Sequence, residues 1–225
     1  MSRFPARHRV PEFAVFASLL RVSTKYGFSD VREALVEDLK GAYPTKWGDF
    51  ETARVLGEDI FGPPIPHPNE VLNLFVAQGI RFAIPFASYR ASLGGFAALM
   101  SDKPGTVLPR HTLACTIYGT GMMQHMRPIN AYKIGCVTTL TKCPERSCIL
   151  NVGTNHGEQR MEALWKLSGV MFGERQGGLL RTPSLGDLTC AKCTEKLESY
   201  HAEYSSACWD VLPVAFKVAK SWDDL

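Results

Sequence analysis

The sequence lacks several features that would assign a class of protein directly. It contains no uncharged apolar run of 18 residues, which excludes a membrane-spanning helix of ordinary length. It also contains no G-x-G-x-x-G, P-loop, H-E-x-x-H or G-x-S-x-G motif, so common signatures of nucleotide-binding proteins, zinc peptidases and serine hydrolases are missing. We therefore expect a protein that is not an enzyme.

A strong excess of charge of one sign is also missing. The 25 basic and 22 acidic residues give a net charge of +3, and this small excess is spread along the chain rather than clustered. Such a charge pattern does not predict a nucleic-acid-binding surface. The hydrophobic content of 45% is that of an ordinary globular protein, and 225 residues suffice for one or two domains with buried cores.

Cysteine is present, but in an arrangement that does not fit a secreted protein. The seven cysteines are odd in number and crowd into the second half of the chain, which is a poor match to a framework of disulfides. The first 20 residues resemble a signal peptide in having basic residues followed by an apolar stretch. However, Glu12 lies between these two parts, and no small-residue cleavage site follows. We therefore expect an intracellular protein, cytoplasmic or nuclear, without a membrane partner.

Helical periodicity dominates the N-terminal region. Between Glu12 and Tyr26, apolar residues recur three and four positions apart, and a second such stripe follows Ser29 and stops at Tyr43-Pro44. Two amphipathic helices joined through Gly27 predict a helical hairpin over residues 1–45. One side of this hairpin should carry its large apolar side chains, which are Phe13, Phe16, Leu20, Leu35 and Leu39.

The rest of the chain is predicted to be a linker followed by a helical domain. Residues 46–69 contain Pro63, Pro64, Pro66 and Pro68, which disfavour helices and central strands and so predict a Pro-rich linker. We interpret 70–225 as a helical C-terminal domain with a small irregular lobe that carries cysteines. Within it, the β-branched stretch 131–148 predicts a loop or a short strand pair, and Ser184 is expected to cap a long helix.

Two short cysteine clusters have the character of a metal site. Four thiols in two clusters can form the tetrahedral, closed sphere of a structural zinc ion, and His201 or His156 can replace one thiol. Buried cysteines that act as small hydrophobic side chains are the alternative, and a redox pair would normally lie at a helix start in a βαβ unit. The predicted zinc ligands are Cys143, Cys148, Cys190 and Cys193.

Three blocks of sequence resemble the large family of BTB (POZ) domain proteins of basidiomycete fungi. The first is RVSTKYGFSDVREALVEDLKGAYPTKW, which is similar to the BACK-like helices that directly follow the BTB domain, and the second is VLNLFVAQGIRFAIPFASYRAS. The third block combines the cysteine pairs with a Trp-x-x-Leu-Pro-x-x-Phe ending and a Trp-acidic-acidic-Leu finish. Its residues are Cys143, Cys148, Cys190, Cys193, Trp209, Leu212, Pro213, Phe216, Trp222 and Leu225.

The resemblance implies a mainly α fold and a function in protein interaction. It covers about Phe13 to Leu225, so the chain is expected to represent the C-terminal, post-BTB part of such a protein without the BTB core. The expected function is that of a non-catalytic interaction or adaptor module of a BTB-domain protein. A cullin-type ubiquitin ligase is an expected partner only if a BTB domain lies upstream. The alternative is a zinc-stabilised nuclear module that contacts nucleic acid, and a hydrolase ranks third.

Overall fold

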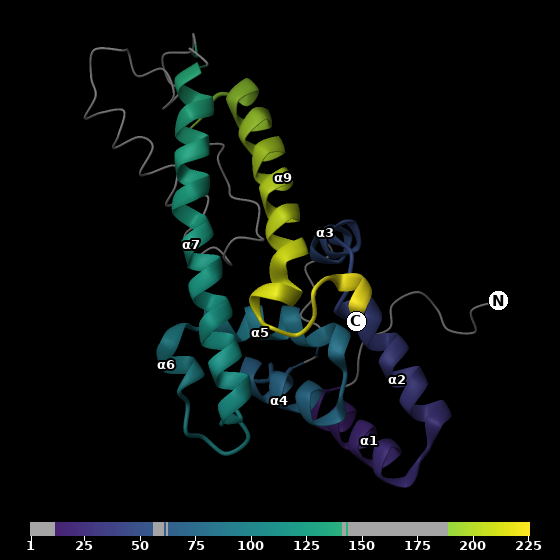
Figure 1. The fold of residues 1–225 in the computed structure, drawn as a ribbon. Coiled ribbons are helices and arrows are strands. Elements are labelled where there is room, and N and C mark those ends of the chain that lie inside the picture. The colour runs from purple at the N-terminus through teal and green to yellow at the C-terminus, as the bar shows by residue number, and fades with distance from the viewer. Residues whose placement is uncertain (1–11, 56–60, 62, 141–142, 144–188) are drawn as a thin grey trace, which may run out of the picture. The chain divides into compact units, whose positions relative to one another are not determined.

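The fold is mainly α-helical, as predicted (Figure 1). The computed structural model describes residues 12–55, 61, 63–140, 143 and 189–225, with the side chains of 52–55 and 127–140 left out of the description. These residues contain no β-strand, and none of their helices combines the length and apolar character needed to cross a bilayer.

The chain divides into two compact units. Unit 1 comprises residues 1–120 and 212–225, and unit 2 comprises residues 121–211. The boundaries fall inside two long helices, α7 (Arg110–Leu140) and α9 (Ala191–Ala215), so each of these helices contributes to both units. The boundaries predicted from the sequence, at 45 and 69, both lie within unit 1.

The predicted hairpin forms the start of unit 1. Helix α1 (Phe13–Tyr26) ends at Gly27, whose φ of 68° is a left-handed conformation that glycine adopts without steric cost, and α2 (Ser29–Ala42) follows. Helix α1 packs against α2 and against α4 (Pro68–Gln78). The predicted apolar side is therefore covered by the unit's own helices, and its buried members are Phe16, Leu20, Leu35 and Leu39.

The prediction of a helix-free linker over 46–69 is wrong at both ends. Residues Trp47–Val55 form helix α3, and Pro68 is the first residue of α4. All the prolines of this stretch follow residue 62, so nothing interrupts α3. At the first position of a helix the missing N–H of proline has no intrahelical partner to lose, and the His67 side chain caps α4 by accepting the Asn69 N–H at 3.2 Å.

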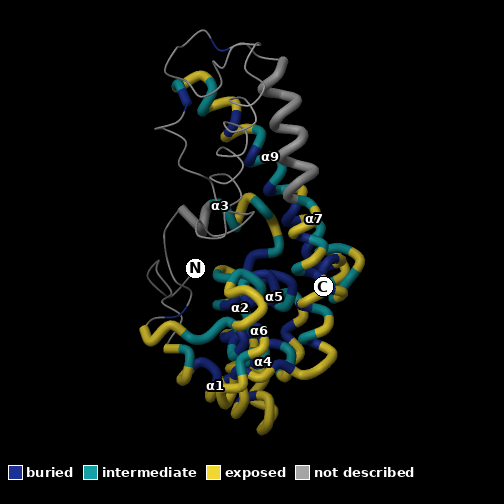
Figure 2. The backbone as a smooth tube through the Cα atoms, turned by 90° about the vertical axis from the view of Figure 1, so that its left-hand side faces the viewer, coloured by how far each residue is buried: buried dark blue, intermediate teal, exposed yellow. Residues whose placement is uncertain are grey.

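The core of unit 1 lies between α4 and α5 (Ile84–Leu93), which are joined by a short 3₁₀ helix, η1 (Arg81–Ala83). Most of α5 is buried and appears dark blue in Figure 2. The Tyr43 ring meets Phe75 of α4 edge-on, with the ring centroids 4.9 Å apart. The buried Asn69 donates hydrogen bonds to the carbonyls of Ala98 and Thr106, and so ties α4 to helix α6 (Gly95–Leu99) and the loop after it.

The predicted loop or strand pair over 131–148 is wrong for its first ten residues. These residues continue α7 to Leu140. Extending an existing helix adds one hydrogen bond per residue without a new nucleation cost, which outweighs the roughly 0.5 kcal/mol per residue that β-branched side chains lose in a helix. Helix α9 begins at Ala191, and Ser184, the predicted cap, lies outside the described residues.

The C-terminal residues complete unit 1. Phe216 lies so close to Gly119 of α7 that a Cβ at position 119 would stand 2.3 Å from the Phe216 ring, which explains why glycine occupies this helical position. The Lys217 ammonium lies 4.0 Å from the centroid of the Tyr118 ring. The Arg81 guanidinium donates to the carbonyl of Val218 at 3.3 Å, before the chain forms the short 3₁₀ helix η4 (Trp222–Asp224).

Candidate functional site

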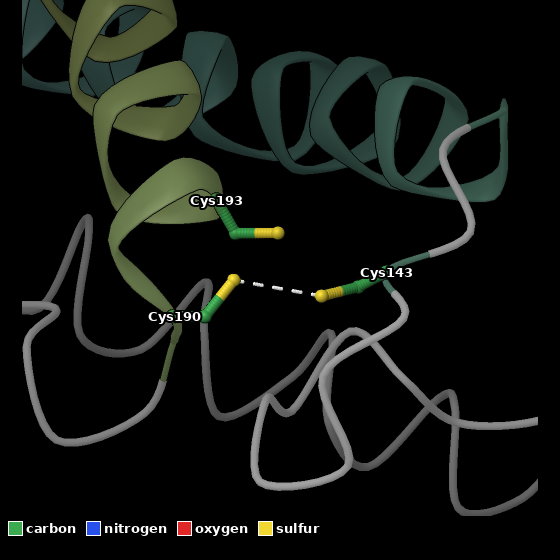
Figure 3. A group of neighbouring side chains, drawn as sticks. All are labelled: Cys143, Cys190 and Cys193. Atoms are coloured by element: carbon green, nitrogen blue, oxygen red, sulfur yellow. Dashed lines mark hydrogen bonds between the residues drawn. The ribbon is translucent and has the colours of Figure 1, made fainter.

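Three of the four predicted zinc ligands come together in unit 2 (Figure 3). The sulfur atoms of Cys143, Cys190 and Cys193 all lie within 4.8 Å of one another, and the Cys143 and Cys190 sulfurs are 3.5 Å apart. Cys143 is buried, whereas Cys190 and Cys193 are half-buried. Residues 47 positions apart in the sequence therefore present their thiols to a common centre. The fourth predicted ligand, Cys148, lies outside the described residues.

The start of α9 positions two of these thiols. The Cys190 carbonyl accepts the Thr194 N–H at 2.9 Å, which makes Cys190 the N-cap, and Cys193 follows within the first turn. The C-x-x-C spacing thus places both sulfurs on the same side of one helical turn, as Figure 3 shows. The positive end of the helix dipole favours the thiolate, which is the form of cysteine that binds metal.

The geometry of the cluster fits zinc. Thiolates at about 2.3 Å from a tetrahedral centre lie about 3.8 Å apart, and the 3.5 Å between the Cys143 and Cys190 sulfurs, with all three sulfurs within 4.8 Å of one another, is compatible with this value. Within the described residues no histidine belongs to the group: His201 lies farther along α9, buried, with its Nδ1 atom 3.2 Å from the Ser205 hydroxyl. His156 lies outside the described residues. The donor set of soft thiols is the one that zinc prefers in structural sites.

The remaining described cysteines have other surroundings. Cys208 is completely buried on α9, and this burial raises the pKa of its thiol to about 11, against the opposing effect of a hydrogen bond with Tyr204. It fits the alternative reading of a cysteine as a small hydrophobic side chain. Cys115 on α7 is half-buried, with its sulfur 3.8 Å from a ring nitrogen of His111. A two-residue contact of this kind does not complete a metal site.

The C-x-x-C pair does lie at a helix start, which is the position expected of a redox pair. The strand that would precede such a helix in a βαβ unit is not found in the part of the chain that the structure describes. The third thiol, Cys143, approaches the pair from the segment after α7. A convergence of three thiols favours metal binding over a simple dithiol–disulfide couple.

A second feature of functional interest is an exposed apolar row on α1 in unit 1. Its side chains follow one another at intervals of four, three and four residues, the spacing of the apolar seam in a coiled coil. Each is between 44% and 62% exposed, although the neighbouring positions Phe16 and Leu20 are buried. We call this surface the α1 row, and its members are Val15, Leu19, Val22 and Tyr26.

The interpretation of the sequence missed the α1 row. The periodicity that identified the buried stripe of this helix singled out Phe13, Phe16 and Leu20, and the second apolar row was not separated from it. The signal was present in the 4-3-4 spacing of Val15, Leu19, Val22 and Tyr26. A helix that is apolar on two sides has more apolar surface than its own unit needs to cover.

Comparison with known proteins gives no match: no family model, no curated protein and no solved structure is similar to the chain.

Proposed function

We propose that this protein is a non-catalytic interaction module, acting as an adaptor in the manner of a BTB-domain protein. The observation that carries the proposal is the α1 row, an apolar surface of four large side chains that the helices of unit 1 leave exposed. Clustered apolar side chains on the surface of a folded protein mark sites of protein association more often than scattered single ones do. The resemblance to the helices that follow a BTB domain supports the same function, because those helices pack on a neighbouring domain.

The experiment that tests this function is a titration with a BTB domain. The full chain is mixed with a recombinant BTB domain of the basidiomycete family, and the heat of binding is measured. We expect a one-to-one complex that the double substitution Leu19→Ser and Val22→Ser weakens by about tenfold or more, a loss of about 1.4 kcal/mol. The matched control is Val107→Ser, which changes a side chain of unit 1 that is 58% exposed and lies outside the α1 row.

The absence of a complex at roughly 100 μM of each protein would contradict the adaptor function in its BTB form. If the Leu19→Ser and Val22→Ser double variant and the Val107→Ser control bind the BTB domain equally well, the protein binds that domain through a surface other than the α1 row.

We further infer that unit 2 holds one structural zinc ion, with Cys143, Cys190 and Cys193 as ligands and Cys148 as the fourth. Bound there, zinc would link the segment after α7 to the first turn of α9. Four thiolates would close the coordination sphere and leave no position for a water molecule or a substrate, so the role of the metal is structural. Thiols of this kind persist in a reducing compartment, which supports a cytoplasmic or nuclear location.

Elemental analysis of the purified protein tests this site. We expect one zinc per chain and slow reaction of the cluster thiols with a thiol reagent until a chelator is added. If the purified protein contains no zinc and these thiols react freely in the native state, the zinc site is contradicted. The cysteines then act as small hydrophobic side chains.

A further inference from the structure

The thiol cluster of unit 2 contains one pair of sulfurs that is placed for direct reaction. The Cys143 and Cys190 sulfurs are 3.5 Å apart, and Figure 3 shows these two side chains pointing toward each other. A disulfide needs an S–S distance of about 2.0 Å, so bond formation requires an approach of about 1.5 Å. The pair therefore has a covalent alternative to holding a metal.

The backbone at this pair allows that approach without breaking a helix. Cys143 comes after the end of α7, and Cys190 is the N-cap that precedes α9, so neither residue lies inside a helix. Cys193, in contrast, lies within the first turn of α9, where the helix fixes its backbone. Among the three thiols, the structure therefore favours a bond between Cys143 and Cys190.

The exposure of the two thiols decides the order in which they react. Cys190 is half-buried, whereas Cys143 is buried. An oxidant that arrives from solvent therefore meets Cys190 first, and Cys143 is the neighbouring thiol that can attack the product. An accessible cysteine beside a second, resolving cysteine is the arrangement typical of thiols that are oxidised reversibly.

We propose that Cys143 and Cys190 form an oxidation site, at which hydrogen peroxide converts two zinc ligands into a disulfide and releases the metal. First the Cys190 thiolate attacks one peroxide oxygen: an S–O bond forms, the O–O bond breaks, and the departing hydroxide takes up a proton to become water. The Cys143 thiolate then attacks the Cys190 sulfur: the S–S bond forms, the S–O bond breaks, and a second hydroxide leaves as water. The two sulfurs together lose the two electrons that the peroxide gains.

This inference rests on the zinc site proposed above and specifies how that site is regulated. The disulfide removes two ligands, and those that remain are too few for the closed coordination sphere of a structural zinc ion. The new bond joins the same two segments that zinc would join, namely the segment after α7 and the start of α9. Because a thiol reductant cleaves a disulfide, unit 2 exchanges a metal link for a covalent one and can return.

The test is a peroxide titration of the full wild-type chain, because replacing a ligand would itself release zinc. Trypsin places the thiols in separate peptides, which are CPER for Cys143, TPSLGDLTCAK for Cys190 and CTEK for Cys193, and Cys148 falls in a fourth. Mass spectrometry after the remaining thiols are blocked therefore distinguishes every pairing. We expect CPER linked to TPSLGDLTCAK, about one zinc released per linked pair, and reversal of both changes by a thiol reductant and added zinc.

Two cysteines outside the cluster are internal controls. Cys115 is half-buried, as Cys190 is, but the contact that its sulfur makes at 3.8 Å is with a ring nitrogen of His111. Cys208 is completely buried. We expect neither to enter a disulfide, and we expect the reduced form of Cys190 to disappear at least about tenfold faster than that of Cys208.

The outcomes separate this inference from the zinc site itself. In protein that contains zinc, a disulfide between any other pair, oxidation only to sulfinic or sulfonic acids, cluster thiols that peroxide leaves unchanged, or a disulfide formed without release of zinc would overturn this inference alone. Protein that contains no zinc before peroxide is added would contradict both the zinc site and the exchange.

Discussion

The two units of this protein bury different kinds of side chain. Unit 1 has a core of aromatic and aliphatic residues, in which Leu72 and Phe75 are fully buried and aromatic rings meet edge-on. In the described part of unit 2 the buried positions are more mixed: Leu197 and Trp209 share the interior with a histidine, a serine and two thiols. Packing of apolar surface accounts for unit 1, because each large buried side chain contributes about 1.5–3 kcal/mol.

This difference explains where the chain would place a metal. A thiolate cluster that binds zinc stabilises the folded state through coordination, which does not depend on the amount of apolar surface that is buried. The three thiols converge in unit 2, where thiol and polar side chains make up most of the described buried residues, whereas in unit 1 the buried polar residues are a minority. We therefore expect unit 1 to depend on packing and unit 2 to depend on metal.

The largest expected effect comes from Cys190→Ser. Removing one ligand should release the zinc, after which the amides of unit 2 lose their protection from hydrogen exchange while those of α4 and α5 keep theirs. Hydrogen exchange read by mass spectrometry reports both units in one experiment. The control is Cys115→Ser, which changes a half-buried thiol outside the cluster and should alter stability by about 1 kcal/mol or less. Protection of unit 2 that survives the loss of zinc would remove the distinction between the units.

The converse change is Phe75→Ala in the core of unit 1. Truncating this fully buried ring should cost about 3–5 kcal/mol of the free energy of unfolding, because it leaves a cavity where Tyr43 and the rest of α4 pack. Denaturant unfolding measures the loss. In the matched variant Phe96→Ala the ring is 65% exposed, so the expected change is within about 0.5 kcal/mol. Equal losses for the two phenylalanines would show that unit 1 does not depend on its core.

Alkaline pH should weaken unit 1 through Tyr43. Burial raises the pKa of this phenol to about 12, although the nearby Arg90 guanidinium acts in the opposite direction. The unfolded chain loses the proton near its ordinary pKa of 10, so the stabilisation is fully present below pH 10 and is lost as the pH rises to 12. Two pKa units correspond to about 2–3 kcal/mol. Tyr43→Phe should therefore show a smaller decrease in stability than the wild type across this interval. Parallel curves for the two proteins would be evidence against the buried phenol.

The smallest effects are expected from two glycines that lie two residues apart on α7 but belong to different units. Gly119→Ala places a methyl group 2.3 Å from the Phe216 ring and should destabilise unit 1 by about 1–3 kcal/mol. A methyl group at position 121 meets nothing within 4 Å, so Gly121→Ala should stabilise the helix by up to about 1 kcal/mol. Thermal unfolding measures the change in melting temperature of each variant, which should fall for Gly119→Ala and rise for Gly121→Ala. A change of the same sign in both variants would contradict the close approach of Phe216 to Gly119.

The sequence alone predicted the helices that depend on local periodicity. It did not predict structure that depends on neighbouring segments of the chain. The hairpin was predicted because Phe16, Leu20, Leu35 and Leu39 repeat at helical intervals. The extension of α7 through 131–140 was missed, because β-branched residues have a weak preference that an existing helix overrides.

The candidate sites follow the same rule. The spacing of Cys190 and Cys193 identified two candidate ligands, but their meeting with Cys143 depends on how a distant segment returns to α9. The α1 row was missed because α1 has two apolar sides, and only the positions of α2 and α4 decide which of them is covered.

The way in which unit 1 is divided along the chain bears on how the protein is made. Residues 212–225 belong to unit 1, yet a ribosome reaches them only after it has produced all of unit 2. During synthesis the first 120 residues must therefore wait, with the surface around Gly119 still open to water, until Phe216 arrives to cover it. Translation order thus places completion of unit 1 after the synthesis of unit 2, and the waiting intermediate is the species that we expect molecular chaperones to recognise.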